Sequence, residues 1–400
     1  MNGKKIQLLV CFIHAHTGGA MTSLVNFLNA LDTDKYDVDV IFYENEDERY
    51  GIKPEINILP QGKVHHSLSV SNIFKKAFSP SYLSAIVREI YYKKIKKNRR
   101  LAIQIMSREG CKYSRRIDKH YDVAVAYETN WPLNYVMTRV SAKRKVLWYH
   151  GDFEKSGMDM RIDRKAFDNA DALVFVSASV AERYKEKYPE HKDKTVFIPN
   201  LLSSAYVRGR DNGEVKLPFE EEQKYIKLLT VARISFEDKG FDRAAAVFSR
   251  LKKEGLLAGV KWVVIGDGRD KTRFEEIIAA EGLTDVIYLI GEKSNPIPYM
   301  KHFDAFFLPS RHEGKPMAVT EGFIMGLPAI VTAYASASEQ IRDGVDGLIF
   351  ENSEEGLYTG LKKLFSSPEV LKVLQKNAAD NDYGNEKEIR LFDKLIDDIL

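Results

Sequence analysis

The chain has 400 residues, of which 44% are hydrophobic and 29% charged, as in a soluble globular protein. This length exceeds what one hydrophobic core normally supports, so two domains are expected. Sixty Lys and Arg against 57 Asp and Glu leave a net charge of +3, which by itself indicates no polyanionic partner. The two cysteines exclude a disulfide framework and favour a reducing cytosol.

The N-terminal stretch MNGKKIQLLVCFIHAHTGGA has an apolar core of about eight residues, a length found in secretory signal peptides. It lacks a small-residue cleavage site, however, and continues into two histidines and two glycines. We therefore interpret it as a first strand and the turn that follows. No run approaches the roughly 20 apolar residues of a membrane span, so a cytoplasmic protein is expected.

Short apolar runs alternate with amphipathic segments along the whole chain. In the first half, strands are expected at residues 6–14, 36–43, 121–128, 144–150, 171–177 and 195–199. In the second half they are expected at residues 225–233, 261–268, 285–291, 304–310, 328–332 and 347–351. Strands that are apolar on both faces and alternate with helices are typical of parallel sheets covered on both sides. Two such series predict an α/β protein with two doubly wound, Rossmann-like domains facing each other across a cleft.

The expected boundaries follow from this alternation. We predict an N-terminal domain at residues 1–205 and a C-terminal domain at residues 206–383. A last helix at residues 384–400 is expected to pack back on the N-terminal domain. The polar stretch at residues 208–224 is interpreted as the linker or as a surface segment beside it.

Doubly wound sheets bind ligands beyond the carboxyl ends of their strands, and several unusual residues lie at such ends. Gly18 and Gly19 follow the first strand, where backbone amides could approach an anion at a helix N-terminus, although a Gly-Gly pair is often only a turn. His150 could bond a sugar hydroxyl or a phosphate, or be structural. Arg233 and Lys239 lie on one loop and suit a diphosphate, the alternative being two solvated surface charges.

The segment RHEGKPMAVTEG, residues 311–322, places Glu313 and Glu321 eight positions apart between two apolar runs. Pro316 fits the first position of a helix and Gly326 its end, which predicts a short helix at residues 316–325. The two carboxylates could then accept hydrogen bonds from hydroxyl pairs on two sugar rings. A solvated helix face, the alternative, conflicts with the apolar sequence around Glu321. The start of this helix offers backbone groups to an anion or polar ligand at Gly314, Lys315, Pro316 and Met317.

Together these residues resemble the group 1 glycosyltransferases, the glycogen-synthase-like family of the GT-B fold that uses nucleotide diphosphate sugars. The resemblance spans nearly the whole chain and is densest at residues 226–351, where the paired glutamates stand in EGKPMAVTEGFIMGLPAIVTAYASASEQIRDGVDGLIFE. The Gly-Gly loop, the strand-end His and the Arg and Lys-Gly pair follow in family order. The sequence departs from the family pattern by one extra residue between Arg233 and Lys239 and by Ala232 in place of a glycine.

The resemblance implies a role for each domain and each position. The N-terminal domain would be the acceptor-side domain and the C-terminal domain the nucleotide-sugar-binding domain. Glu313 would hold the donor sugar and Glu321 the ribose, while His150 would lie near the reacting carbon. The departing diphosphate would be neutralised by Arg233, Lys239 and the amides of Gly18 and Gly19. The family retains anomeric configuration, so no protein nucleophile is assigned, and protein cations replace a metal, so no metal or other cofactor is expected. The implied reaction moves a hexose or N-acetylhexosamine, with a UDP-sugar favoured, to a glycan or lipid-linked acceptor of bacterial cell-surface polysaccharide.

Residues 74–117 carry 13 Lys and Arg and two Glu, so this segment has a charge of +11 and the rest of the chain about −8. Apolar residues interleave with this charge at near-helical spacing, which suits an anionic membrane surface. Nucleic acid is the other polyanion to consider, but no nucleic-acid motif accompanies the segment. The alternative is a solvated helical hairpin. We predict peripheral binding to the inner face of the cell membrane.

Two other classes of function stay open on the sequence. Both halves look like dinucleotide-binding sheets, and GDGRDKTR after WVVI mimics part of a phosphate-binding fingerprint, so an NAD-dependent enzyme is one alternative. The complete G-x-G-x-x-G is missing, however. The other alternative is a catalytically silent GT-B partner protein, against which the intact Glu and cation positions argue. A nucleotide-sugar epimerase on the same plan would lack the paired-glutamate segment.

Overall fold

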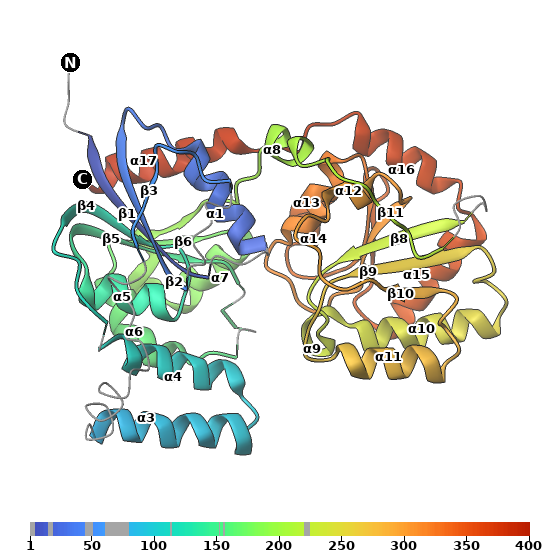
Figure 1. Ribbon diagram of the computed structural model, residues 1–400, viewed down its shortest axis with the longest axis horizontal. Helices are drawn as coiled ribbons and strands as arrows, with labels where there is room; N and C mark the ends of the chain where they lie inside the picture. The colour runs from blue at the N-terminus through green and yellow to red at the C-terminus, as the bar shows by residue number, and fades with distance from the viewer. Residues whose placement is uncertain are drawn as a thin grey trace. The chain divides into compact units, whose positions relative to one another are not determined.

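The computed structural model describes residues 5–14, 19–44, 51–60, 80–112, 114–151, 153–154, 157–219 and 225–400 (Figure 1). The chain forms two compact units. Unit 1 comprises residues 1–201 and 386–400, and unit 2 comprises residues 202–385. The chain therefore passes between the units at residues 201/202 and 385/386, where the sequence led us to expect boundaries at 205/206 and 383/384.

Unit 1 contains a parallel sheet of seven strands in the order β3-β2-β1-β4-β5-β6-β7. The strands are β1 (Ile6–His14), β2 (Tyr36–Glu44), β3 (Asn57–Ile58), β4 (His120–Ala126), β5 (Ser141–Tyr149), β6 (Ala172–Phe175) and β7 (Thr195–Phe197). β1 pairs with β2 on one side and β4 on the other, so the strand order reverses between β1 and β4. Ligands bind at such a switch point in doubly wound sheets.

The helices of unit 1 cover this sheet. They are α1 (Gly19–Ala30), α3 (Pro80–Ile90), the π-helical turn η2 (Tyr91–Ile95), α4 (Arg99–Cys111), α5 (Trp131–Arg139), α6 (Met160–Asn169), α7 (Ala178–Lys187), the 3₁₀ turns η3 (Pro189–Lys194) and η4 (Glu386–Glu388), and α17 (Ile389–Ile399). The last helix, α17, returns to unit 1 because Phe392 packs on aromatic residues there. Its ring centroid lies 4.9 Å from that of Phe27 and 6.1 Å from that of Trp148. The Tyr36 hydroxyl also donates to Asp393 Oδ1 at 2.6 Å.

Unit 2 repeats the plan with six parallel strands in the order β10-β9-β8-β11-β12-β13. The strands are β8 (Ile226–Val231), β9 (Val260–Ile265), β10 (Ile287–Leu289), β11 (Ala305–Leu308), β12 (Ala329–Thr332) and β13 (Gly347–Phe350). The helices are α8 (Ser204–Gly209), α9 (Phe236–Lys239), α10 (Phe241–Lys253), α11 (Lys271–Ala280), α12 (Ile297–Met300), α13 (Met317–Ile324), α14 (Ala337–Gln340), α15 (Glu354–Ser366) and α16 (Val370–Ala379). The switch point of this sheet lies between β8 and β11.

The core of unit 2 shows why apolar runs form its strands. All four residues of β11 are buried, so both faces of the strand lie against apolar side chains. Trp262 of β9 is fully buried and packs against Phe248 and Phe307, with ring centroids 4.9 and 5.1 Å away. Its Nε1–H donates to Thr230 Oγ1 at 2.8 Å, which satisfies the one polar group of the indole. The predicted α/β class with two doubly wound sheets is confirmed.

The structure locates two segments from the sequence analysis, the polar stretch and the basic segment. The polar stretch belongs to unit 2 as far as residue 219, where Asp211 pairs with Lys301 at 2.9 Å and Arg210 Nη2 donates to the Ser294 carbonyl at 3.2 Å. The basic segment forms a hairpin of α3, η2 and α4, which lie side by side at the margin of unit 1 (Figure 1). Residues 74–79 and 113 of that segment lie outside the described residues.

Candidate active site

The Lys239 side chain pairs with Glu313 after two adjacent strands of unit 2. Lys239 ends α9, beyond β8, and Glu313 lies in the loop beyond β11. Lys239 Nζ is 2.5 Å from Glu313 Oε1, and the side chains are 17% and 9% exposed. Ser310 Oγ donates to the same oxygen at 2.6 Å. Two of the sequence-predicted site residues are therefore brought together, in a nearly water-free position where charge interactions are strong.

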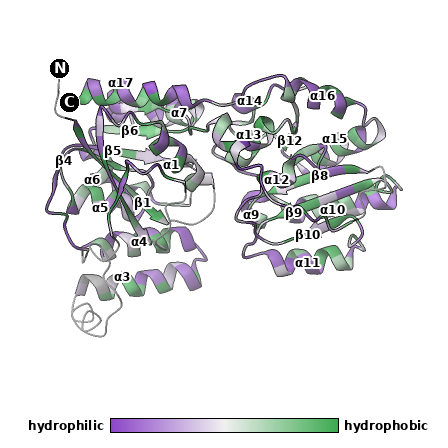
Figure 2. Ribbon diagram, turned by 45° about the horizontal axis from the view of Figure 1, so that its top comes forward, coloured by the Kyte–Doolittle hydropathy of each residue, from purple (hydrophilic) through white to green (hydrophobic). Residues whose placement is uncertain are grey.

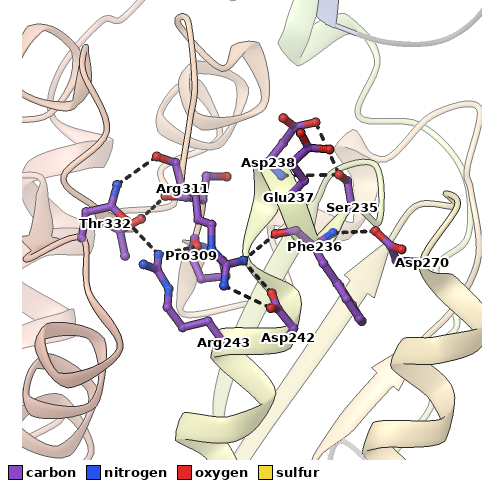
Figure 3. A network of polar contacts seen from close by, with 12 residues as sticks. Ser235, Phe236, Glu237, Asp238, Asp242, Arg243, Asp270, Pro309, Arg311 and Thr332 are labelled. Carbon is purple, nitrogen blue, oxygen red and sulfur yellow. Dashed lines mark hydrogen bonds and ion pairs between the residues drawn. The ribbon is translucent and has the colours of Figure 1, made fainter. Parts of the chain in front are cut away.

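Backbone contacts hold the two loops in this register. The N–H groups of Arg311 and His312 both donate to the Asp238 carbonyl, at 2.8 and 3.1 Å. Gly240 has a φ of +67°, and a Cβ there would overlap the Pro309 carbonyl oxygen. Glycine at 240 is thus required twice, by its left-handed conformation and by the close approach of the next loop. Figure 3 shows Pro309 and Arg311 facing the start of α10 and the α9 turn.

The glycines after β9 support the same loop from the other side. A Cβ on Gly266, whose φ is +153°, would overlap the Ala232 carbonyl, and one on Gly268 would overlap that of Ile234. Asp270 Oδ2 accepts from the Phe236 N–H at 2.7 Å. The sequence GDG, which mimics a dinucleotide fingerprint, therefore serves here to pack the β9 loop against the β8 loop.

Arg233 pairs with Asp238 rather than with Glu313. Its side chain is 67% exposed, and its Nη2 is 3.4 Å from Asp238 Oδ2. In the described state the two predicted cations thus differ, since Lys239 is desolvated and paired while Arg233 is open to solvent. The role of Arg233 at a diphosphate stays a prediction.

Glu321 lies within α13 and is 6% exposed. Burial raises the pKa of this carboxyl to about 7, while the charge of Arg210 acts in the opposite direction. Among the described residues, its carboxylate has no hydrogen bond or ion pair, although buried carboxylates are normally paired. A buried acceptor without a donor indicates a place for ligand hydroxyls.

The start of α13 differs from the expected helix by one residue. The helix begins at Met317, and Pro316 precedes it with a ψ of 116°, so Pro316 is the N-cap residue rather than the first helical one. Gly326, with a φ of +79°, follows its end as expected. In the described part of the chain, the Met317 and Ala318 N–H groups have no backbone acceptor. They are the free donors expected of a helix N-terminus.

Two side chains donate hydrogen bonds to the backbone just before α13. The Gly314 carbonyl accepts from Ser336 Oγ. Gln340 Nε2 donates to the Pro316 carbonyl at 2.9 Å. Burial lowers the pKa of Lys315, opposed by the charge of Glu339. A half-buried ammonium beside free amides favours an anion at this end of α13.

The strand ends of unit 1 carry a neutral network. His150 Nε2 bonds the Tyr127 carbonyl at 2.8 Å, and its Nδ1 lies 3.1 Å from Asn200 Oδ1. Ser23 Oγ bonds both the Tyr127 hydroxyl at 2.9 Å and Asn200 Oδ1 at 3.0 Å. Burial lowers the pKa of His150 to about 4, so the ring is neutral at pH 7. A neutral imidazole has one N–H and can donate to only one of these two oxygens, and the role of His150 at the donor sugar stays a prediction. Gly19 opens α1, and Gly18 lies outside the described residues.

Glu128 is a candidate that the sequence analysis missed. It follows β4 at the switch point, directly after Tyr127, and is half-buried. Burial raises the pKa of its carboxyl to about 7, and no residue in the described ranges bonds it. Two positions on, Asn130 has the unusual φ, ψ pair of 63° and −114°. Strained backbone and a desolvated carboxyl often mark functional sites. The available signal was a charged residue at the end of an apolar strand.

Comparison with known proteins places this geometry in a family. The family model described as "Glycosyl transferases group 1" matches residues 213–381, and the model "Glycosyltransferase Family 4" matches residues 17–203. The chain belongs to the group 1 glycosyltransferases. It is therefore a glycosyltransferase, and its two doubly wound units have the GT-B fold, as the sequence predicted.

Individual relatives agree with the family. An uncharacterized glycosyltransferase of Haemophilus influenzae is 24% identical over 396 residues, which cover 96% of this chain and 98% of that one. The N-acetylgalactosamine-N,N'-diacetylbacillosaminyl-diphospho-undecaprenol 4-alpha-N-acetylgalactosaminyltransferase of Campylobacter jejuni is 27% identical over 172 residues, 42% of this chain and 43% of that one. The crystal structure of Anabaena HepE in complex with UDP and glucose superposes with a TM-score of 0.66 at 13% identity, covering 98% and 100% of the two chains.

Within the described ranges, no group of three or more His, Cys, Asp or Glu side chains is arranged to hold a metal ion. No helix found in those ranges combines the length and the apolar character needed to cross a bilayer.

Proposed function

We propose that this glycosyltransferase moves a hexose or N-acetylhexosamine from a UDP-sugar, with retention of configuration, to a glycan or lipid-linked acceptor in cell-surface polysaccharide synthesis. Two observations carry the donor half of this proposal: the desolvated Lys239–Glu313 pair, and the Glu321 carboxylate that no described residue pairs. The related HepE was crystallised with UDP and glucose, which supports a UDP-sugar. The Campylobacter relative is named for a diphospho-undecaprenol acceptor, which supports a lipid-linked one.

The chemistry follows from charge. When the glycosidic bond to the diphosphate breaks, negative charge builds on the leaving phosphate. Lys239, supported by Arg233, Lys315 and the free amides of α13, would stabilise that charge in place of a metal ion. Glu313 would accept hydrogen bonds from the sugar and Glu321 from the ribose hydroxyls, because a ligand donor would satisfy the Glu321 carboxylate that the protein leaves without a partner.

Retention needs no protein nucleophile in this scheme. The acceptor hydroxyl approaches the face from which the diphosphate departs, and a phosphate oxygen takes its proton. The O–C bond to the acceptor forms as the C–O bond to the phosphate breaks, so the products are the glycoside and the nucleoside diphosphate. Neutral His150 would offer the donor sugar a hydrogen bond only by exchanging its contact with the Tyr127 carbonyl or with Asn200 Oδ1 for one with the ligand.

A thermal-shift screen tests the donor assignment. UDP, GDP, ADP, their glucose and N-acetylglucosamine conjugates, and NAD are added separately to the full chain, because a ligand that binds only the folded state raises its melting temperature. We expect UDP and a UDP-sugar to give the largest shifts. Stabilisation by NAD alone would favour the dehydrogenase alternative. Binding without release of UDP from any UDP-sugar, with or without added acceptor, would favour the silent-partner alternative.

The acceptor half of the proposal includes an anionic membrane surface. The exposed apolar side chains on α3 and η2 follow one helical stripe: Leu83, Val87, Ile90, Tyr91 and Ile95, of which Val87 and Ile95 are 66% and 67% exposed. Basic residues flank the stripe: Arg88, Lys93, Lys94, Lys96 and Lys97. Figure 2 shows hydrophilic and hydrophobic residues mixed along α3. This is the pattern of a helix that lies in the membrane interface.

Vesicle flotation tests the membrane surface. Attraction to an anionic bilayer is worth about 1 kcal/mol per basic residue close to it. Replacing Lys93, Lys94, Lys96, Lys97, Arg99 and Arg100 with Gln should therefore release the protein from phosphatidylglycerol vesicles. Lys372→Gln with Lys376→Gln, on the exposed face of α16, is the matched control and should still float. A wild-type protein that ignores anionic vesicles would contradict the proposal.

A further inference from the structure

Arg311 spans two helices with one guanidinium. Its Nη1 lies 2.6 Å from Asp242 Oδ1 and its Nη2 3.1 Å from Asp242 Oδ2, which is a two-pronged carboxylate pair. Nη1 also donates to the Phe236 carbonyl at 2.5 Å. Phe236 is the first residue of α9, and Asp242 lies in the first turn of α10. Figure 3 shows the guanidinium reaching both groups at once.

The α9 turn depends on such outside contacts. It contains four residues, Phe236–Lys239, and a single turn is not stable in isolation. Its local hydrogen bonds are two backbone ones, from the Lys239 N–H to the Ser235 carbonyl and from the Gly240 N–H to the Phe236 carbonyl, and a long cap in which Ser235 Oγ accepts from the Asp238 N–H at 3.4 Å. Lys239 is the last residue of this turn, so any movement of α9 moves its ammonium relative to Glu313.

The loop that carries Arg311 is fixed from its other side. Arg243 Nη2 donates to the Pro309 carbonyl at 3.0 Å and to Asn352 Oδ1 at 2.9 Å. Asn352 Nδ2 in turn donates to the Arg311 carbonyl at 3.0 Å. Pro309 and Arg311 are therefore anchored to α10 and to the segment after β13. The Arg311 side chain transmits this anchoring to α9, together with the Arg311 and His312 N–H groups that donate to the Asp238 carbonyl.

We propose that Arg311 is a positioning residue that clamps α9 to the loop at residues 309–313 and thereby sets Lys239 at the diphosphate of the donor. Its fork is occupied by Asp242 and Phe236, so it acts through Lys239 rather than on the substrate itself. The inference rests on the proposed function, since it assigns Lys239 a phosphate partner. It also explains why an arginine stands at 311: a lysine has the charge but not the planar fork that reaches both groups.

Calorimetric titration of the full chain with UDP tests the clamp. Arg311→Met and Arg311→Lys should each weaken UDP about tenfold with unchanged stoichiometry. Partial unfolding of a variant would give a different result, because it would lower the apparent stoichiometry and leave the Kd of the folded fraction unchanged. Arg250→Met is the matched control, because Arg250 of α10 also pairs with a carboxylate, Glu355 Oε2 at 2.6 Å, and should bind UDP as the wild type does.

A double-mutant cycle separates a clamp from a general structural role. Lys239→Ala alone should weaken UDP, and adding Arg311→Met to it should cause little further loss, because the clamp has no Lys239 left to place. Losses that multiply in the double variant would overturn the proposal. So would an Arg311→Lys variant that binds UDP normally, since the positive charge alone would then suffice.

The same titration separates failure of the clamp from failure of the donor assignment. Wild-type protein that binds UDP, with Arg311 variants that bind it equally well, would refute the clamp and leave the donor assignment standing. Wild-type protein that binds neither UDP nor a UDP-sugar would refute the donor assignment, and the clamp with it.

Discussion

The two units share one architecture but carry different chemistry at the carboxyl ends of their strands. In unit 2 these ends hold desolvated charges, such as Lys239 against Glu313. In unit 1 they hold a neutral network around His150, whose pKa burial lowers to about 4, and the Glu128 carboxyl, whose pKa burial raises to about 7. Fixed charge favours a phosphate-bearing ligand, and neutral hydrogen-bonding groups suit hydroxyls. The difference shows that the fold determines where a site forms, whereas a few residues at the strand ends determine what the site binds.

The largest expected effect concerns the integrity of unit 1. Phe392→Ala should destabilise unit 1 by about 3–5 kcal/mol, because it empties a fully buried aromatic site between Phe27, Tyr36 and Trp148. Chemical denaturation should show this loss in the transition of unit 1 and leave that of unit 2 in place. Val373→Ala, at a 58% exposed position of α16, is the control and should change little. A loss confined to unit 2 would show that α17 does not stabilise unit 1.

The second effect tests the charges of unit 2. Lys239→Ala and Arg233→Ala should each lower the rate of transfer by about 10²–10³, the usual result of removing one group that stabilises a developing anion. Steady-state kinetics at saturating donor provide the measurement, with melting curves to verify the fold. Normal turnover in both variants would return these residues to the surface charges that the sequence left as the alternative.

The sequence predicted the architecture well because buried parallel strands are continuous apolar runs. All twelve expected strands are present, for example the run FDAFFLPS around β11. The two-residue strand β3 was missed because it is too short to show any pattern. Glu313 and Lys239 were identified from residue type and position, but their 2.5 Å pairing depends on how two loops pack. The same holds for the clamp by Arg311 and for the protein partners of His150, which no spacing in the sequence encodes.

The third effect is a pH dependence of ligand binding. Burial raises the pKa of Glu321 from 4.5 to about 7, so the folded protein favours the protonated form below that pH. Ribose hydroxyls donate to the carboxylate, so binding favours the deprotonated form, and the affinity for UDP should rise about tenfold from pH 6 to pH 8. Glu321→Gln should bind more weakly and lack this rise. The titration of UDP itself is common to both proteins, so equal pH profiles would contradict the assignment.

The smallest effect is a pH dependence of folding stability caused by Glu128. Burial raises the pKa of this carboxyl to about 7, as it does for Glu321. A raised folded-state pKa means that wild-type stability falls as the pH rises from about 4.5 to 7. Glu128→Gln removes this loss, which for a fully desolvated carboxyl would be about 3 kcal/mol. Because Glu128 is only half-buried and solvent screens it, the variant should be more stable than the wild type by about 1 kcal/mol at pH 8, and equal to it at pH 4. Glu182→Gln, an exposed position on α7, should show no such difference. Denaturation curves at both pH values provide the measurement, and a variant less stable than the wild type at pH 8 would show that the Glu128 carboxylate is paired.

Calorimetric titration of two variants, each with UDP and with the UDP-sugar, tests the central claim. This claim is that unit 2 binds the ribose and the transferred sugar of the donor with separate carboxylates. Glu321→Ala should weaken UDP and the UDP-sugar alike, because both contain the ribose. Glu313→Ala should weaken the UDP-sugar and leave UDP nearly unchanged. Equal losses for both ligands in both variants would contradict the claim.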